Sequence, residues 1–304
     1  MSKFINPFTD YGFKLIFGRE VSKILLIEFL NDLLEGERVI TDLTFLNNEQ
    51  LPDYPEGRGI IYDVYCTTDT GEKIIVEMQN RMQSNFKERS IFYLSRAIVN
   101  QGRTGHDWKF EIKAVYGVFL MNFIMDKNIK LRTDVILADK ETGELFSEKF
   151  RQIFIALPLF KKSEEECETN FERWIYILNN METLKRLPFK ARKAVFEKLE
   201  EIADVASMSP KERELYDNSV KVYRDYLVTM DAAEKEGIKK GMEEGRKKGL
   251  EEGLKEGREE GLKKGREEAL NIFQTAIDMK KQGIDNQLIA EKTGLPLSLI
   301  ESLK

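Results

Sequence analysis

The sequence predicts an α/β domain, a mixed sheet flanked by helices, followed by an extension made only of helices. Two observations carry this prediction. Within residues 1–160, segments with apolar residues at helical spacing are interspersed with short β-branched runs, whereas only helical spacing remains from residue 161 onward. Hydrophobic residues make up 41% of the 304 residues, so the chain can bury a sizeable core.

The first expected element is an amphipathic helix over residues 10–34. Thr9 or Asp10 can cap its start, since both side chains accept hydrogen bonds from free helical N–H groups. Its apolar residues recur at helical spacing: Phe13, Phe17, Ile24, Ile27, Leu30 and Leu34.

Strands and one helix are expected next. The predicted strands cover residues 40–47, 59–67, 73–79, 110–123, 132–138 and 150–157. Asp69, Thr70 and Gly71 form a turn signal that joins the second and third of them into a hairpin. A helix is predicted over residues 85–100, where apolar residues return to helical spacing.

The region 161–231 is predicted to be a helical extension of the first domain. Helical spacing is found over residues 170–179, 189–203 and 211–230, and Pro188 and Pro210 mark helix boundaries.

The region 232–268 contains a glycine at every fourth position, separated almost entirely by Glu, Lys and Arg. On a helix these glycines form a stripe that drifts by about 40° per repeat. One interpretation is close helix–helix contact, hence a homo-oligomer formed through the C-terminal helices. The other is a flexible, solvated spacer. Both stay open, because little apolar surface is available to drive association.

The last region, 269–304, resembles a short helix-turn-helix. Ala290 permits close packing, Gly294 makes the turn, and Ile289, Leu295 and Ile300 are apolar. A structural cap or dimer contact is expected ahead of DNA contact, because the second helix has few side chains suited to reading bases.

Composition limits the classes of function. The net charge of −5 argues against an overall basic nucleic-acid-binding surface but permits a local basic cleft. No run of about 18 apolar residues suggests a membrane span, and the N-terminus lacks the apolar segment of a signal peptide. Cys66 and Cys167 are too few for a disulfide framework. We therefore expect a cytoplasmic protein with no membrane partner.

Two acidic residues lie in the predicted hairpin among apolar ones. With a turn at residues 69–71, Asp63 lies across from Glu77, at a Cβ separation of roughly 5 Å. Alternation along the strand places Glu77 and Gln79 on one face, and Val76 and Met78 on the other.

Like charges facing each other destabilise a sheet unless a cation neutralises them, and carboxylate oxygens suit Mg²⁺ or Mn²⁺. The alternative is a solvated sheet face with Lys or Arg partners. That alternative is weakened by the neighbours expected on this face, Ile61, Tyr65 and Ile75, which are not typical of a wet surface.

The arrangement D-X13-E-X-Q over Asp63, Glu77 and Gln79 resembles the PD-(D/E)XK nuclease superfamily, and more narrowly its family transposases and recombination-promoting nucleases. The resemblance covers residues 6–125. It also rests on a set of separated motif residues: Asp10, Gly12, Phe13, Lys14, Phe17, Gly18, Phe29, Leu30, Asn31, Val76, Met78, Glu88, Arg89 and Tyr93.

The resemblance implies a restriction-endonuclease-like fold and a Mg²⁺-dependent DNA endonuclease linked to recombination or a mobile element. Asp63 and Glu77 would bind the metal together with the Met78 backbone carbonyl, and Glu28 is a candidate accessory acid. DNA would be the partner.

The sequence departs from the family pattern in one position. The family pattern often ends in Lys, whereas this chain has Gln79, which carries no charge; Lys14 and Arg89 are candidate substitutes for that cation. A catalytically weak or inactive DNA-binding or oligomeric scaffold is therefore the alternative function, and an RNA substrate also stays open. Other catalytic chemistries have little support, because His106 is the only histidine.

Overall fold

The computed structural model of the chain describes residues 2–51, 58–103, 105, 108–190 and 193–303. It divides into two compact units, Met1–Tyr226 and Leu227–Lys304, hereafter the first and second units. His106 lies outside the described residues. No helix among the described residues is long and apolar enough to cross a membrane.

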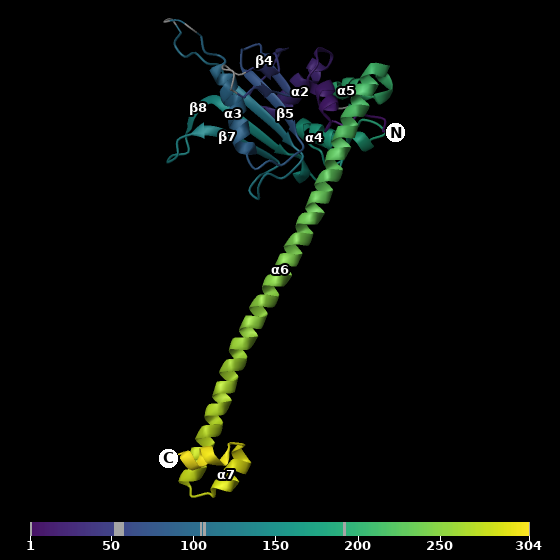
Figure 1. Ribbon diagram of the computed structural model, residues 1–304. Helices are drawn as coiled ribbons and strands as arrows, with labels where there is room; N and C mark the ends of the chain where they lie inside the picture. The colour runs from purple at the N-terminus through teal and green to yellow at the C-terminus, as the bar shows by residue number, and fades with distance from the viewer. Residues whose placement is uncertain (1, 52–57, 104, 106–107, 191–192, 304) are drawn as a thin grey trace. The chain divides into compact units, whose positions relative to one another are not determined.

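A six-stranded mixed sheet forms the centre of the first unit, as the sequence predicted (Figure 1). Its spatial order is β1-β4-β5-β6-β8-β7. Strands β5, β6 and β8 run parallel, and the other pairings are antiparallel. The strands are β1 (Leu43–Phe45), β4 (Val64–Thr68), β5 (Lys73–Gln79), β6 (Val115–Met121), β7 (Arg132–Ala138) and β8 (Leu145–Ala156); β2 (Glu49–Gln50) and β3 (Ile60–Ile61) pair separately.

Eight α-helices are distributed along the described residues, several of them shorter or longer than predicted. They are α1 (Asp10–Phe17), α2 (Lys23–Leu33), α3 (Phe86–Val99), α4 (Asn170–Asn180), α5 (Val195–Ala203), α6 (Pro210–Lys281), α7 (Asn286–Thr293) and α8 (Leu297–Ser302). The helix expected over residues 189–203 begins only at Val195.

The single helix predicted over residues 10–34 is wrong: two helices occupy this stretch. Thr9 caps α1 by accepting a hydrogen bond from the Gly12 N–H. The helix ends at Gly18, whose N–H donates to the Lys14 carbonyl, and Arg19 is extended (φ −123°, ψ 151°). This extended residue breaks the helical run before α2 begins.

The strand predicted over residues 59–67 is also interrupted. Ladder pairing stops after Ile61 and resumes at Val64. Between them the Tyr62 N–H donates to the Asn48 carbonyl, and the Asp63 N–H donates to the Glu77 carboxylate. Those two bonds take the backbone out of the regular ladder. Farther along, β6 is shorter than predicted, and β8 is longer because it extends into a hairpin with β7.

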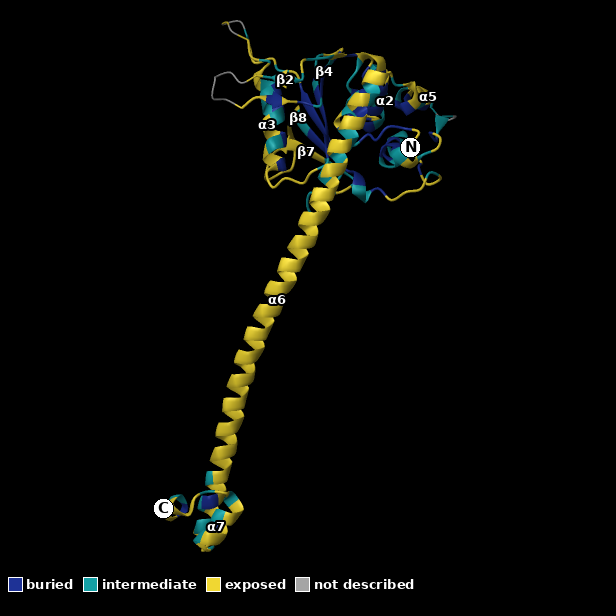
Figure 2. Ribbon diagram, turned by 45° about the vertical axis from the view of Figure 1, so that its right-hand side comes forward, coloured by how far each residue is buried: buried dark blue, intermediate teal, exposed yellow. Residues whose placement is uncertain are grey.

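One face of the sheet carries the larger core, covered by α1, α2, α4 and α5 (Figures 1 and 2). Trp174 of α4 packs on Phe17 and Phe29 at ring-centroid distances of 6.0 and 5.8 Å. Its indole N–H donates to Asp32 of α2 at 2.9 Å. Helices α4 and α5, expected as an extension, thus contribute to the core of the first unit.

The opposite face is covered by α3. The helix approaches β6 closely at Gly117, where an added Cβ would lie 2.5 Å from the Leu94 Cδ1 atom. A second core of aromatic and aliphatic side chains fills this layer: Tyr62, Tyr65, Ile75, Phe86, Phe119 and Phe154 are among its members. The candidate site residues Glu77 and Gln79 of β5 lie on this α3 face.

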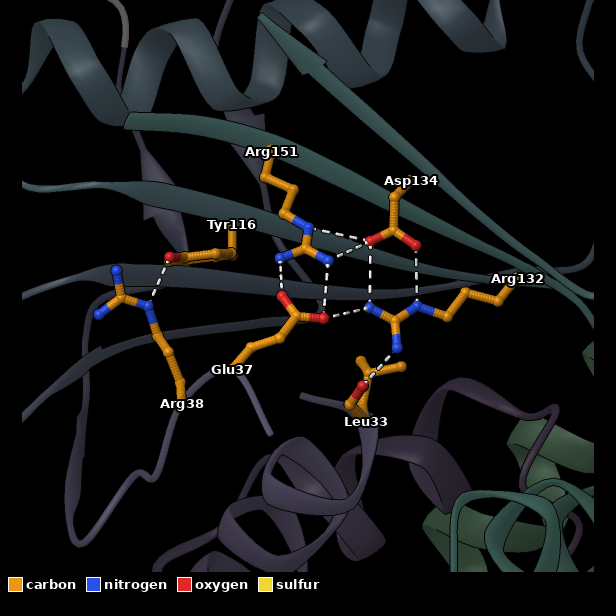
Figure 3. Close-up of polar contacts among 7 residues, drawn as sticks. All are labelled: Leu33, Glu37, Arg38, Tyr116, Arg132, Asp134 and Arg151. Carbon is orange, nitrogen blue, oxygen red and sulfur yellow. Dashed lines mark hydrogen bonds and ion pairs between the residues drawn. The ribbon is translucent and has the colours of Figure 1, made fainter. Parts of the chain in front are cut away.

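A network of ion pairs and hydrogen bonds links the end of α2 and the turn that follows it to strands β7 and β8 (Figure 3). Glu37 and Asp134 each accept hydrogen bonds from both Arg132 and Arg151. Arg132 also donates to the Leu33 carbonyl at 2.6 Å. Hydrogen bonding to Arg151 lowers the pKa of Glu37. The network therefore stabilises the ionised form of Glu37.

The second unit contains most of α6, followed by α7 and α8. Gly294 ends α7 in the left-handed conformation (φ 71°), so the predicted pair of short helices with a turn at this glycine is present. Ala276, Ile289 and Ile300 form its small core. The glycine-rich stretch is helical, and residues 227–272 are exposed throughout (Figure 2).

Candidate active site

Asp63 and Glu77 lie side by side at the ends of β4 and β5. The register predicted from the turn is confirmed by the pairs from Thr67–Lys73 to Val64–Val76, and its continuation sets Asp63 level with Glu77. The Asp63 N–H donates to Glu77 Oε1 at 3.1 Å, and the Met78 N–H donates to Asp63 Oδ2 at 2.9 Å. Backbone donors thus fix both carboxylates in place.

The side chains alternate as the sequence predicted. Glu77 and Gln79 share the α3 face with Ile75, whereas Val76 and Met78 belong to the core on the other side. Glu77 is 2% exposed and Gln79 9% exposed. The Gln79 amide donates to Glu77 Oε2 at 2.9 Å, so that it orients the carboxylate.

The expected contribution of Ile61 to this apolar surround is wrong, because Ile61 is 66% exposed. The break between β3 and β4 turns it outward. Tyr62 takes its place: its ring is fully buried and packs on Tyr65 and Tyr93 at centroid distances of 4.9 and 5.4 Å. The acids are therefore bordered by tyrosines.

Burial and mutual repulsion perturb both acids. The pKa of Glu77 is raised to about 8, first by burial and then by the charge of Asp63. Burial likewise raises the pKa of Asp63. The hydrogen bond from the Met78 N–H and the positive charges of Lys14 and Arg89 lower this pKa, but burial has the larger effect. Two carboxylates that cannot both ionise without cost are a candidate site for a cation.

Lys14 and Arg89 bring positive charge toward the acids from the two helix layers. Lys14 of α1 pairs with Asp10 at 2.6 Å, and its charge acts on Asp63. Arg89 of α3 stacks on the Tyr93 ring at 5.3 Å and acts on both acids. Both residues, candidates by resemblance, are thus within electrostatic range of the pair.

Glu28 is not brought to the acids. Its carboxylate pairs with Lys193 at 2.7 Å, and Lys193 also binds Asp32 at 2.6 Å. The acidic neighbour that sequence reasoning missed is Asp10, whose charge raises the pKa of Asp63. Its place at the start of α1, in a segment already singled out by resemblance, was the available signal.

The donor set fits a hard divalent cation. Asp63 and Glu77 offer carboxylate oxygens, the ligand type that Mg²⁺ and Mn²⁺ prefer, and the backbone of Met78 contacts Asp63 through its N–H. No group of three or more His, Cys, Asp or Glu residues suited to a metal occurs in the described part of the chain. The acid pair with backbone oxygen is therefore the candidate. Burial raises the pKa of Cys66 to about 12, which removes it as a nucleophile.

The sequence pattern of the PD-(D/E)XK nuclease family transposases matches residues 7–233. The chain belongs to this family. Its sheet and flanking helices are accordingly a restriction-endonuclease-like fold. The matched range includes every candidate site residue and ends before Gly237, the first glycine of the repeat. Comparison with curated proteins and with solved structures gives no match.

Proposed function

We propose that this family member is a metal-dependent DNA endonuclease that acts in recombination or for a mobile element, in the cytoplasm. The observation that carries the proposal is the pair of facing carboxylates, half-buried Asp63 and buried Glu77, each held by a backbone N–H and each with a raised pKa. These residues, with the Met78 carbonyl, would hold Mg²⁺ or Mn²⁺. Such an ion supplies charge neutralisation and Lewis-acid activation for phosphodiester hydrolysis.

The surrounding side chains have separate tasks in this proposal. Gln79 uses its amide N–H on Glu77, which leaves its oxygen to accept a hydrogen bond from the attacking water and orient it. Lys14 and Arg89 place positive charge where the phosphate would lie. Asp10, beside Lys14, is an additional candidate ligand in place of Glu28.

DNA contacts are assigned to basic residues near the acids. Arg81 stacks on the Tyr226 ring at 4.2 Å, and Lys87 and Arg89 lie on α3. Such side chains can bind phosphates even though the whole chain has a charge of −5.

The test is nicking of supercoiled plasmid by the purified full chain with Mg²⁺ or Mn²⁺. We expect Asp63→Ala and Glu77→Ala to reduce nicking by about 100-fold or more. Glu28→Ala is the matched control, because the carboxylate of Glu28 is engaged with Lys193, and it should retain activity. Nicking that persists in both site variants would refute this assignment.

The alternative is a non-cleaving DNA-binding scaffold, favoured by the neutral Gln79 where the family pattern often has a lysine. It predicts that a folded, metal-loaded wild type binds plasmid without nicking it. A gel-shift measurement beside the nicking assay separates the two functions.

We also propose that the chain is a homo-oligomer in which α6 pairs with α6 of a second copy. Large side chains follow each glycine of the repeat, and the apolar ones are more than half exposed: Ile238, Met242, Leu250, Leu254 and Leu262. An added Cβ at any of the eight repeat glycines meets nothing within 4 Å, so this face has no partner among the described residues.

Charge complementarity favours an antiparallel pair with Gly253 opposite Leu254 of the second copy. In that register every glycine of the repeat faces a large side chain of the second copy, which can pack into the space that the glycine leaves open. Three charged doublets on either side of the centre also face doublets of opposite sign: 239–240 (Lys) with 267–268 (Glu), 243–244 (Glu) with 263–264 (Lys), and 247–248 (Lys) with 259–260 (Glu). A parallel pair in register would instead oppose like charges.

Charge reversal tests this pairing. One variant reverses the signs of the doublets in 239–248, and the other reverses those in 259–268. Each alone should be monomeric by light scattering, whereas the mixture should form a heterodimer because every doublet again faces its opposite. Dimers of either single variant, or no dimer of the wild type, would contradict the antiparallel register.

A further inference from the structure

A cavity of about 320 Å³ lies on the α3 face of the sheet and is separate from the acid pair, neither member of which lines it. It opens between α3, the loop between β6 and β7, and the strands β7 and β8. Its size is at the lower end of the range of small-molecule sites. The lining residues that matter here are Ser90, Ile91, Met125, Ile129, Gln152 and Phe154.

The floor of the cavity holds an amide with an unused acceptor. Gln152 is 3% exposed, and its amide N–H donates to Ser90 Oγ at 2.8 Å. Ser90, 1% exposed, donates in turn to the Lys87 carbonyl. Gln152 Oε1 has no hydrogen-bond partner among the described residues. It is not sealed in the core either, because the only sealed, unpartnered side-chain atoms described are Tyr11 Oη and Arg173 Nε.

The walls around this amide are apolar. Phe154, Ile91, Met125, Ile129 and Val135 supply the apolar lining, and Asn128 and Thr133 also border the cavity. At the rim Lys87 pairs with Asp126 at 2.8 Å. An apolar slot with one buried acceptor suits a flat ligand that has N–H donors on its edge.

The cavity lies on the same face as the acid pair and close to it. Glu77 pairs with Phe119 of β6, which pairs with Phe154 of β8. The backbones of Glu77 and Phe154 are therefore separated by two strand spacings, about 10 Å. Helix α3 serves both places, since Arg89 acts on the acids and the neighbouring Ser90 supports Gln152.

We propose that this cavity binds one unstacked nucleobase of the substrate strand, a few nucleotides from the bond that is cut. The base would place its faces against Phe154 and Ile91, and an N–H on its edge would donate to Gln152 Oε1. Phosphates on either side would follow Lys87 and Arg89. This inference rests on the proposed nuclease function, and it adds a determinant of where cleavage occurs.

The test uses the full chain without divalent ions, so that binding is measured apart from cleavage. Single-stranded oligonucleotides carry 2-aminopurine, or an abasic site, at one position after another. We expect 2-aminopurine fluorescence to rise at one position on binding, and an abasic site there to weaken wild-type binding by about tenfold.

Two variants and one control complete the experiment. Gln152→Met removes the acceptor at similar size, and Ile91→Trp fills the cavity from its exposed wall. Both should abolish the position-specific signal. Phe92→Trp, the next exposed residue of α3, should keep it. The base site is refuted, and the nuclease function is not, if the wild type nicks DNA but no position shows the fluorescence or abasic-site effect. The same holds if the two variants keep the position-specific signal. Loss of both DNA binding and nicking in the wild type would refute both.

Discussion

At the scale of single residues, Glu77 is the feature that departs most from an ordinary folded protein. It is 2% exposed, faces Asp63, and has its pKa raised to about 8. Such a group destabilises the fold when it ionises, and that cost is typical of a site whose function requires charge. Its hydrogen bonds from Asp63 N–H and Gln79 reduce the cost and hold the carboxylate in position.

We therefore expect the stability of the metal-free protein to fall as pH rises from 5 to 8. The folded-state pKa of Glu77 is higher than in the unfolded chain, so the folded state holds the extra proton and loses that advantage through this window. Glu77 alone contributes at most about 1.4 kcal/mol per pH unit to the slope, and Asp63, whose pKa is also raised, adds with the same sign. Urea unfolding in chelator measures it.

Glu77→Gln provides the comparison, since an amide does not titrate and the slope should flatten. Glu37 and Asp134 do not interfere: their pKa values are lowered, so their contributions are present above the unfolded pKa and are lost only in acid. Equal slopes in wild type and variant would show that Glu77 ionises normally.

At the scale of elements, the packing of α3 on β6 positions the face of the sheet that carries the candidate site. Gly117 makes this contact possible because Leu94 occupies the space of a side chain there. The same helix carries Arg89 toward the acids and Ser90 toward Gln152. A shift of α3 would thus disturb both sites together.

Gly117→Ala is expected to destabilise the protein by roughly 1–3 kcal/mol, the usual effect of overpacking a close contact. The new Cβ would lie 2.5 Å from Leu94 Cδ1 and 2.7 Å from the Phe119 ring. Chemical unfolding gives the difference. Gly237→Ala is the control, because Gly237 is helical and an added Cβ meets nothing there; this substitution should be neutral or stabilising. Gly143 is not used as a control, because its positive φ would strain any other residue. An unchanged unfolding midpoint for Gly117→Ala would mean that α3 is not seated this closely.

At the scale of the whole molecule, the first unit requires helices from beyond the sheet. Trp174 packs on Phe17 and Phe29, and Tyr216 of α6 accepts a hydrogen bond from the Asn6 N–H at 2.8 Å. The nuclease fold therefore continues to Tyr226, close to the end of the family match at residue 233.

A chain ending at residue 233 should consequently fold, whereas one ending at residue 160 should not. The shorter chain would leave Phe17 and Phe29 without Trp174 and expose the α2 surface. Near-ultraviolet circular dichroism and the cooperativity of thermal unfolding report the difference. A cooperative transition in the chain of 160 residues would contradict the shared core.

The sequence by itself determined the local geometry of the candidate site. The turn at Asp69–Gly71 and the two-residue period of a strand decide that Asp63 lies across from Glu77 and that Gln79 shares its face. Both are short-range constraints, which is why they can be read without a structure. The mixture of strands and helices in the first 160 residues and the helices after residue 161 followed from periodicity in the same way, whereas the parallel pairing of β5, β6 and β8 did not.

Only the tertiary structure decided which distant groups meet the acids. Lys14 and Arg89 act on the acids electrostatically from separate helices, whereas Glu28 is bound by Lys193, far away in the chain. The helix break at Gly18 and the packing of Trp174 were likewise decided by the tertiary structure. Such contacts depend on how layers pack, and residues on different elements carry no periodic signal of their eventual neighbours.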